Sequence, residues 1–97
     1  MNTAKFQLGW LLATPGALEA IEASVQTAAD FLNRHAAGDW GDVDAEDATA
    51  NEATLLDASR IFSVYHTARS VKLYVITEAT DDEGRRAATT IILRDEY

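Results

Sequence analysis

The chain contains no cysteine among its 97 residues. This absence excludes a disulfide framework, a thiolate metal site and a cysteine nucleophile. Long apolar runs are missing as well, since the longest, at residues 10–13, is far too short to span a bilayer. We expect no leader peptide, because residues 1–5 lead directly into folded-looking sequence. These observations favour a protein that stays in the cytoplasm.

Basic residues are scarce. Eight lysines and arginines face sixteen aspartates and glutamates, which leaves a net charge of -8. Such a charge repels nucleic acids and anionic membranes, because binding either of them normally needs a basic surface. We therefore predict no direct binding to nucleic acid or membrane. A basic protein or nucleoprotein complex remains a possible partner.

Composition and length indicate one globular domain over residues 1–97. Apolar residues make up 47% and charged residues 25% of the chain, which is close to the globular average. Near the start, alternating apolar residues predict a strand at residues 6–13, with Trp10 in the core. Thr14 followed by Pro15 is typical of the start of a helix.

Two further helices are expected in the middle of the chain. Thr27 is a suitable N-cap for one of them, and Gly38 is well placed to end it. Asp44 is a suitable N-cap for the next helix, which we expect to end near Asp57. Glu52 falls on the apolar side of that helix, so we expect it to pair with an arginine, Arg60 being the nearest.

The pattern changes at residue 60, where β-branched and aromatic residues become frequent. It predicts strands at residues 60–66, 71–77 and 89–94, the first two joined by a tight turn. The order of the elements predicts an α+β fold. We expect an N-terminal strand, two or three helices and a three-stranded antiparallel meander, with the helices on one face of the sheet.

Several short segments, spread over nearly the whole chain, resemble a family of short bacterial proteins encoded on plasmids, phages and integrated elements, which are usually named plasmid-related proteins. These segments are Ala13–Leu18, Arg34–His35, Gly38–Asp42, Asn51, Arg60 with Ser63 and Tyr65, Val75–Ala79, Thr89–Ile91 and Glu96–Tyr97. The Gly-Asp-Trp-Gly and Val-Ile-Thr-Glu-Ala blocks are the most specific. The loop from Asp81 to Ala88 is longer than the family pattern, and Arg94 stands where proline is common.

The resemblance implies no catalytic or binding residues, but it does imply a genomic setting. Small acidic proteins of mobile elements often block a host protein, particularly a defence system that handles foreign DNA. We therefore expect a non-enzymatic inhibitor in the cytoplasm of the bacterial host. A CRISPR effector or a restriction enzyme is the expected kind of target.

A run of carboxylates gives this hypothesis a candidate surface. No lysine or arginine lies between Arg34 and Arg60, while aspartates and glutamates accumulate there. Such a face can imitate the phosphates of DNA and occupy a basic groove, although a solvated helix face is the plainer alternative. Trp40 is either an exposed anchor or a lid over the core. The predicted partner-binding residues are Asp39, Trp40, Asp42, Asp44, Glu46 and Asp47.

The sequence predicts no catalytic residues, metal or cofactor. We expect His35 and His66 to be packing residues, because neither belongs to a triad or ligand motif. A calcium loop starting at Asp42 fails, since Asp47 stands where glycine is required. A second hypothesis is an accessory domain that self-associates, as a homodimer, through the exposed edge of the strand at residues 6–13.

Overall fold

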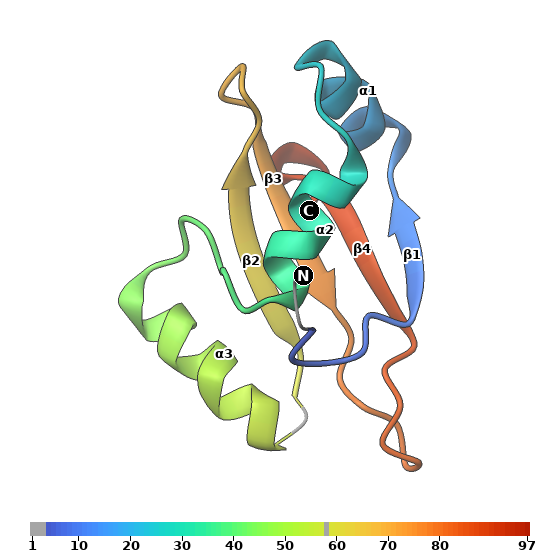
Figure 1. Cartoon of the computed structure of the whole chain (residues 1–97), viewed down its shortest axis with the longest axis vertical. Helices are drawn as coiled ribbons and strands as arrows, with labels where there is room; N and C mark the ends of the chain where they lie inside the picture. Colours follow the sequence, from blue (N-terminus) through green and yellow to red (C-terminus); the bar gives the residue numbers. More distant parts are fainter. Residues whose placement is uncertain (1–3, 58) are drawn as a thin grey trace.

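The computed structural model describes residues 4–57 and 59–97. These residues form an α+β fold, which is the class that the sequence predicts, with three α-helices and a four-stranded sheet (Figure 1). In chain order the elements are β1 (Trp10–Ala13), α1 (Pro15–Ala23), α2 (Ala28–Ala36), α3 (Ala45–Asp57), β2 (Ile61–His66), β3 (Lys72–Thr77), β4 (Ala88–Leu93) and a 3₁₀ helix (Arg94–Glu96).

The sheet is mixed rather than purely antiparallel. Its strand order is β1-β4-β3-β2, in which β2, β3 and β4 are antiparallel neighbours. The N-terminal strand β1 joins the β4 edge in parallel, with Trp10 opposite Ala88 and Ala13 opposite Ile91. The expected meander is therefore incomplete as a description of the sheet. The long stretch of chain between β1 and β4 supplies the crossover that a parallel pair needs.

The predicted helix starts are confirmed. The Thr14 hydroxyl accepts a hydrogen bond from the Ala17 N–H at 3.1 Å, and Pro15 follows at the first helical position. The Asp44 carboxylate accepts from the Asp47 N–H at 2.8 Å. Each bond satisfies an amide that the first helical turn leaves without a partner.

The helices do not all lie on one face of the sheet. Helices α1 and α2 cover one face, whereas α3 lies beside β2 at the edge of the sheet (Figure 1). The Asn51 amide fixes α3 there by donating to the Phe62 carbonyl at 2.6 Å, and the Asn51 carbonyl accepts from the Phe62 N–H at 3.1 Å. The expected one-sided arrangement is thus right for two helices and wrong for the third.

The N-terminal strand is shorter than predicted. It begins at Trp10, because Gly9 has φ +67° and turns the chain. The preceding segment crosses to the helical side, where Phe6 packs against the His35 ring at 5.2 Å between centroids. Leu11 pairs with the buried Thr89, so Trp10 projects from the opposite face. It is 80% exposed, and its expected place in the core is wrong.

The apolar core lies between α1, α2 and the sheet. Its fully buried large side chains are Ile21 and Phe31 from the helices and Tyr65, Leu73, Val75 and Ile91 from the strands. These residues occupy one end of the covered sheet face. Toward the other end, the same face carries buried polar side chains, which are described below.

Gly41 gives a direct test of how closely the chain packs against β2. Its φ is +70°, and an added Cβ would lie 2.0 Å from the Val64 carbonyl oxygen. We expect Gly41→Ala to lower the free energy of unfolding by more than about 2 kcal/mol. The control is Gly84→Ala, where φ is +78° but no atom lies within 4 Å, and where the cost should be about 1 kcal/mol. Equal losses in denaturant titrations would contradict this packing.

Candidate functional site

The first of the predicted contact residues, Asp39, is held inside its own loop. One carboxylate oxygen accepts from Arg34 Nε at 2.7 Å, and the other accepts from the Gly41 N–H at 3.1 Å. The bond from Arg34 is the main reason that the pKa of Asp39 is lowered. The Tyr65 hydroxyl donates to the Asp39 carbonyl. Asp39 therefore stabilises the loop, and the Arg34 guanidinium balances the negative charge of its carboxylate.

Trp40 is a lid rather than an exposed anchor. It is only 6% exposed, and its indole Nε1 donates to Glu52 Oε1 at 3.0 Å. The Phe6 ring stacks against it, with 6.1 Å between centroids. The expected pair between Glu52 and Arg60 is wrong, because Glu52 receives the indole N–H and Arg60 instead donates to the Tyr97 hydroxyl at 2.6 Å.

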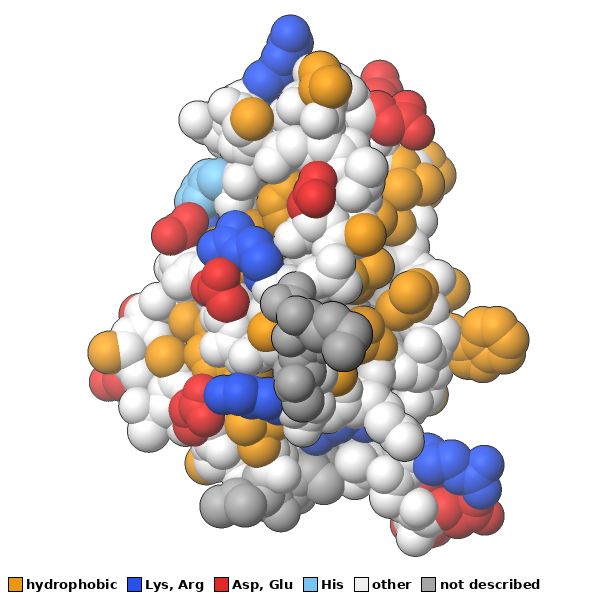
Figure 2. All heavy atoms as spheres, in the orientation of Figure 1, with side chains coloured by type: hydrophobic (Ala, Val, Ile, Leu, Met, Phe, Trp, Pro, Cys, Tyr) orange, Lys and Arg blue, Asp and Glu red, His pale blue; other side chains and the backbone are white. Residues whose placement is uncertain are grey.

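The remaining acidic residues of the predicted surface differ in their local partners. Asp42 pairs with His66, Oδ2 to Nδ1 at 2.7 Å, and the His66 side chain is 42% exposed rather than packed. Asp44 is the N-cap of α3. Among the described residues, no ion pair involves Glu46 or Asp47 in the first turn of α3. On the face that Figure 2 shows, acidic side chains are scattered, several of them beside basic ones.

A chain of hydrogen bonds runs through the polar end of the core. His35 is fully buried, as expected for a packing residue. Its Nδ1 lies 2.5 Å from Ser63 Oγ, and its Nε2 lies 2.8 Å from Thr77 Oγ1. Thr77 Oγ1 lies 2.6 Å from Thr89 Oγ1, which donates to the Leu8 carbonyl at 2.7 Å. The chain thus links α2, three strands and the N-terminal segment.

The last hydrogen bond of this series, from Thr89 to the Leu8 carbonyl, fixes the donor and the acceptor in the two bonds before it. Because Thr89 donates to a carbonyl, it must accept from Thr77, which in turn accepts from the imidazole. His35 therefore carries a proton on Nε2. Because burial keeps the ring neutral near pH 7, Nδ1 carries no proton and accepts from Ser63. Burial lowers the pKa of His35 to about 4, and Arg86 contributes to this shift.

This histidine and serine do not form an accessible nucleophilic pair. Both side chains are 0% exposed, and the rings of Phe6 and Trp40 lie against His35 at 5.2 and 6.0 Å, so neither side chain is open to a substrate. Satisfied buried networks of this kind specify one packing of the core. We therefore assign the His35 chain a structural role.

The two edge strands of the sheet differ in the hydrogen bonding of their outward backbone groups. At the β2 edge, other parts of the chain bind these groups, so this edge is closed. The Val64 N–H donates to the Trp40 carbonyl at 3.1 Å, and the Val64 carbonyl accepts from the Asp42 N–H at 2.7 Å. Two residues away, Asn51 binds both backbone groups of Phe62. The Gly-Asp-Trp-Gly-Asp loop and α3 therefore occupy the positions that another strand would take.

The β1 edge is open. Trp10 and Thr14 donate their N–H groups to carbonyls on the β4 side, at Ala87 and Ile91, both at 3.0 Å. Backbone groups alternate along a strand, so those of Leu11 and Ala13 point away from the sheet. Within residues 4–57 and 59–97, no hydrogen bond to this outer side is present. Figure 1 shows β1 at the right-hand margin with nothing beyond it.

An apolar groove accompanies the open edge. It encloses about 410 Å³ between β1 and the two helices that cover the sheet. Hydrophobic side chains follow this side of the molecule in Figure 2. Three of the six exposed large apolar residues among those described line it, namely Leu11 (56%), Leu12 (53%) and Leu18 (41%). The groove is lined by Leu11, Leu12, Ala13, Leu18, Ala28, Ala29, Leu32 and Ile91.

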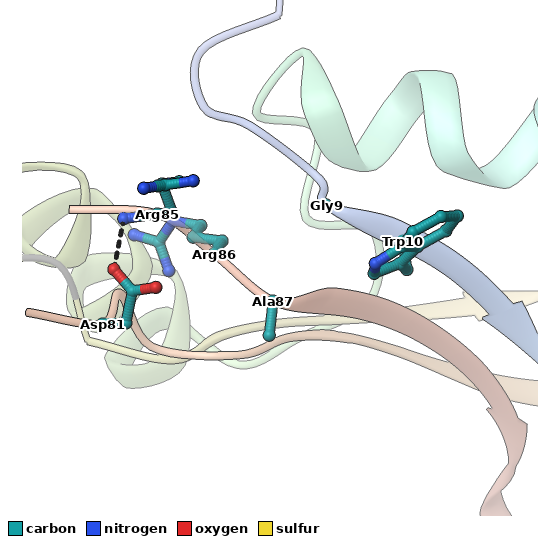
Figure 3. A pocket seen from close by; sticks show the side chains of 6 residues that line it. All are labelled: Gly9, Trp10, Asp81, Arg85, Arg86 and Ala87. Carbon is teal, nitrogen blue, oxygen red and sulfur yellow. Dashed lines mark hydrogen bonds between the residues drawn. The ribbon is translucent and has the colours of Figure 1, made fainter. Parts of the chain in front are cut away.

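A second cavity, of about 490 Å³, lies where β1 begins and is lined by Gly9, Trp10, Asp81, Arg85, Arg86 and Ala87 (Figure 3). The two arginines that line this cavity already have partners within the chain. Arg85 pairs with Glu83, and Arg86 donates to the Ser59 and Glu78 carbonyls at 2.8 and 2.9 Å. The polar groups here do not converge on the space beside Trp10, so we do not take this cavity as the functional site.

Within the described parts of the chain, no group of three or more histidine, aspartate or glutamate side chains is placed to hold a metal ion. No helix in those same residues is both long enough and apolar enough to cross a membrane.

Comparison with protein-family models, curated proteins and solved structures finds no match to this chain. The resemblance to plasmid-related proteins therefore stays a prediction. The most distinctive feature of the geometry is the open, apolar β1 edge.

The sequence predicts the open strand edge, but it does not predict the side of the groove that the helices α1 and α2 form. Residues 6–18 contain no charged side chain, which is a visible signal in a chain that is 25% charged. The contribution of Ala28 and Ala29 could not be found in this way, because small residues on a helix show no preference for one neighbour over another.

The buried histidine predicts a specific pH dependence of stability. The unfolded chain binds a proton at His35 with a pKa near 6.5, whereas the folded chain does so only near pH 4. The contribution is complete above pH 6.5 and is lost as the pH falls toward 4, up to about 3 kcal/mol. We expect the free energy of unfolding to fall by about 1 kcal/mol between pH 6 and 5.

Denaturant titrations at a series of pH values measure this slope. His66→Gln, which removes the exposed histidine, should keep most of it, and His35→Gln should remove it. A wild-type stability that is flat between pH 6.5 and 5 would show that His35 is not held neutral by burial.

Proposed function

We propose that this protein works by binding another protein through the β1 edge, which adds a strand to its sheet. The observation that supports the proposal is the contrast between the two edges. The chain closes the β2 edge with Asn51, Trp40 and Asp42, whereas β1 has no charge, and no bulge or covering segment is present on it among the residues that the structure describes. Proteins usually block a bare apolar edge, because it pairs readily with other chains.

Strand addition would use both the backbone and the groove. A partner strand would pair with the outward N–H and carbonyl groups of Leu11 and Ala13, which provide affinity. Alternate side chains of that strand would enter the apolar groove beside Leu18, which provides selectivity. Burying these leucines removes apolar area from water, and each fully buried leucine contributes about 2 kcal/mol.

The proposed activity is binding, without chemistry. In support, the buried His35 chain is fully hydrogen-bonded and closed to substrates, and the arginines near Trp10 are engaged. The setting implied by the family resemblance, a mobile element in the bacterial cytoplasm, is compatible with a small binding protein. It remains part of the proposal.

A displayed library of random peptides tests the edge without knowledge of the natural partner. Leu11→Lys places a charge beside the outward backbone groups, and it should reduce the binding of the selected peptides at least about tenfold. Val25→Lys is the matched control, because Val25 is 94% exposed but lies outside the groove. Thermal unfolding checks that both variants fold.

The outcome is decisive in either direction. Peptides that bind the wild type and Val25→Lys but not Leu11→Lys would support the β1 edge. Equal binding to both variants, or a library that yields no binding peptide, would overturn the proposal.

A second candidate retains the acidic hypothesis in a narrower form. Glu46 and Asp47 are exposed on a helix that contains no lysine or arginine, and neither has an ion pair among the described residues. We propose them as the remaining carboxylates able to meet a basic surface of a nucleic-acid-handling host complex. Charges of this kind mainly accelerate association and make binding depend on salt.

Charge reversal separates the two candidates. Glu46→Lys with Asp47→Lys should weaken the capture of a basic host complex several-fold at low salt and have little effect at high salt. Glu19→Lys with Glu22→Lys, on α1, is the matched control for net charge. If both double variants lose the same amount of binding, net charge and not this surface is responsible.

A further inference from the structure

We infer that the β1 edge is occupied by a second copy of this chain, in a two-fold symmetric dimer with antiparallel β1 strands. The inference rests on the proposed function, because it names the partner for the same surface. Two four-stranded sheets would then continue as one, and no open β1 edge would remain. Symmetric dimers of this kind need a patch that complements itself.

The charge pattern meets that requirement. The chain carries a net charge of -8, so most pairs of its surfaces would repel each other. Residues 6–18 are the exception, since they contain no charged residue at all. When this segment faces its own copy, no like charges are brought into direct contact. An acidic surface could not pair with itself in this way.

The backbone fixes the register. Extended conformation begins after Gly9, whose φ of +67° breaks the ladder, and continues through Thr14, at φ -70° and ψ 152°. Helix α1 starts at Pro15. The centre of this extended segment is Leu12, so full overlap of two antiparallel copies places Leu12 opposite the partner's Leu12. Leu11 then pairs with the partner's Ala13 through the outward backbone groups.

This register also closes the groove. Leu11 and Ala13 lie on the helical face of the sheet, where the wall of the groove is formed by Leu18 and by the small residues Ala28 and Ala29. A second copy brings the same wall from the other side. The two grooves would join into one apolar core between the subunits, and small side chains allow the helices to approach closely.

Sedimentation equilibrium with the full chain tests the assembly. The wild type and Val25→Lys should form a dimer, and Leu11→Lys should weaken it at least about tenfold, because each subunit loses apolar contact and gains a buried charge. Added salt should strengthen the dimer, since it screens the repulsion between two acidic subunits. A wild type that is monomeric at all concentrations would overturn the inference.

A single cysteine tests the register, since the chain has no other. Opposite residues at a position without backbone bonds have Cα atoms about 4.5 Å apart, which is within the range of a disulfide. Under mild oxidation Leu12→Cys should therefore form a covalent dimer rapidly, and Val25→Cys should form it slowly. Equal rates, or faster cross-linking of Leu11→Cys, would overturn this register.

The two proposals can fail separately. If the wild type is monomeric but the selected peptides still require Leu11, the second copy is the wrong occupant and the edge remains the binding surface. If Leu11→Lys dimerises as well as the wild type and also binds the peptides, both proposals are wrong.

Discussion

The structure depends on whether the outward backbone groups of each edge strand of the sheet find hydrogen-bond partners. At β2, the loop around Trp40 and the Asn51 amide take up the outward backbone groups of Val64 and Phe62. At β1, the described part of the chain places no hydrogen-bond partner on the outward backbone groups of Leu11 and Ala13. Unpaired backbone groups next to exposed leucines are stable only when solvent or another chain satisfies them. The proposed function follows from this asymmetry.

The closed edge and the polar core are connected. Asp39 holds the loop through Arg34, and its carbonyl receives the Tyr65 hydroxyl, whose pKa burial raises to about 12. Trp40 then covers the His35 ring from one side, while Phe6 covers it from another. Asp39, Trp40 and Asp42 of the acidic loop thus make contacts within the fold.

Much of the fold could be predicted from the sequence, because local signals were strong. Thr14 with Pro15, and Asp44, marked helix starts, and β-branched residues marked the last three strands. The parallel pairing of β1 and the position of α3 could not be predicted, since both depend on contacts between distant residues, such as Asn51 with Phe62. For the same reason the burial of Trp40 and the exposure of Trp10 could not be settled from their neighbours in sequence.

The central claim, that β1 is an open edge which a second copy of the chain occupies, is tested most directly by amide hydrogen exchange measured residue by residue at low and high protein concentration. The account predicts that Phe62 and Val64 exchange slowly at both concentrations, whereas Leu11 and Ala13 exchange rapidly in dilute protein and more slowly as the concentration rises. Slow exchange of Leu11 and Ala13 in dilute protein, or exchange that does not change with concentration, would contradict it.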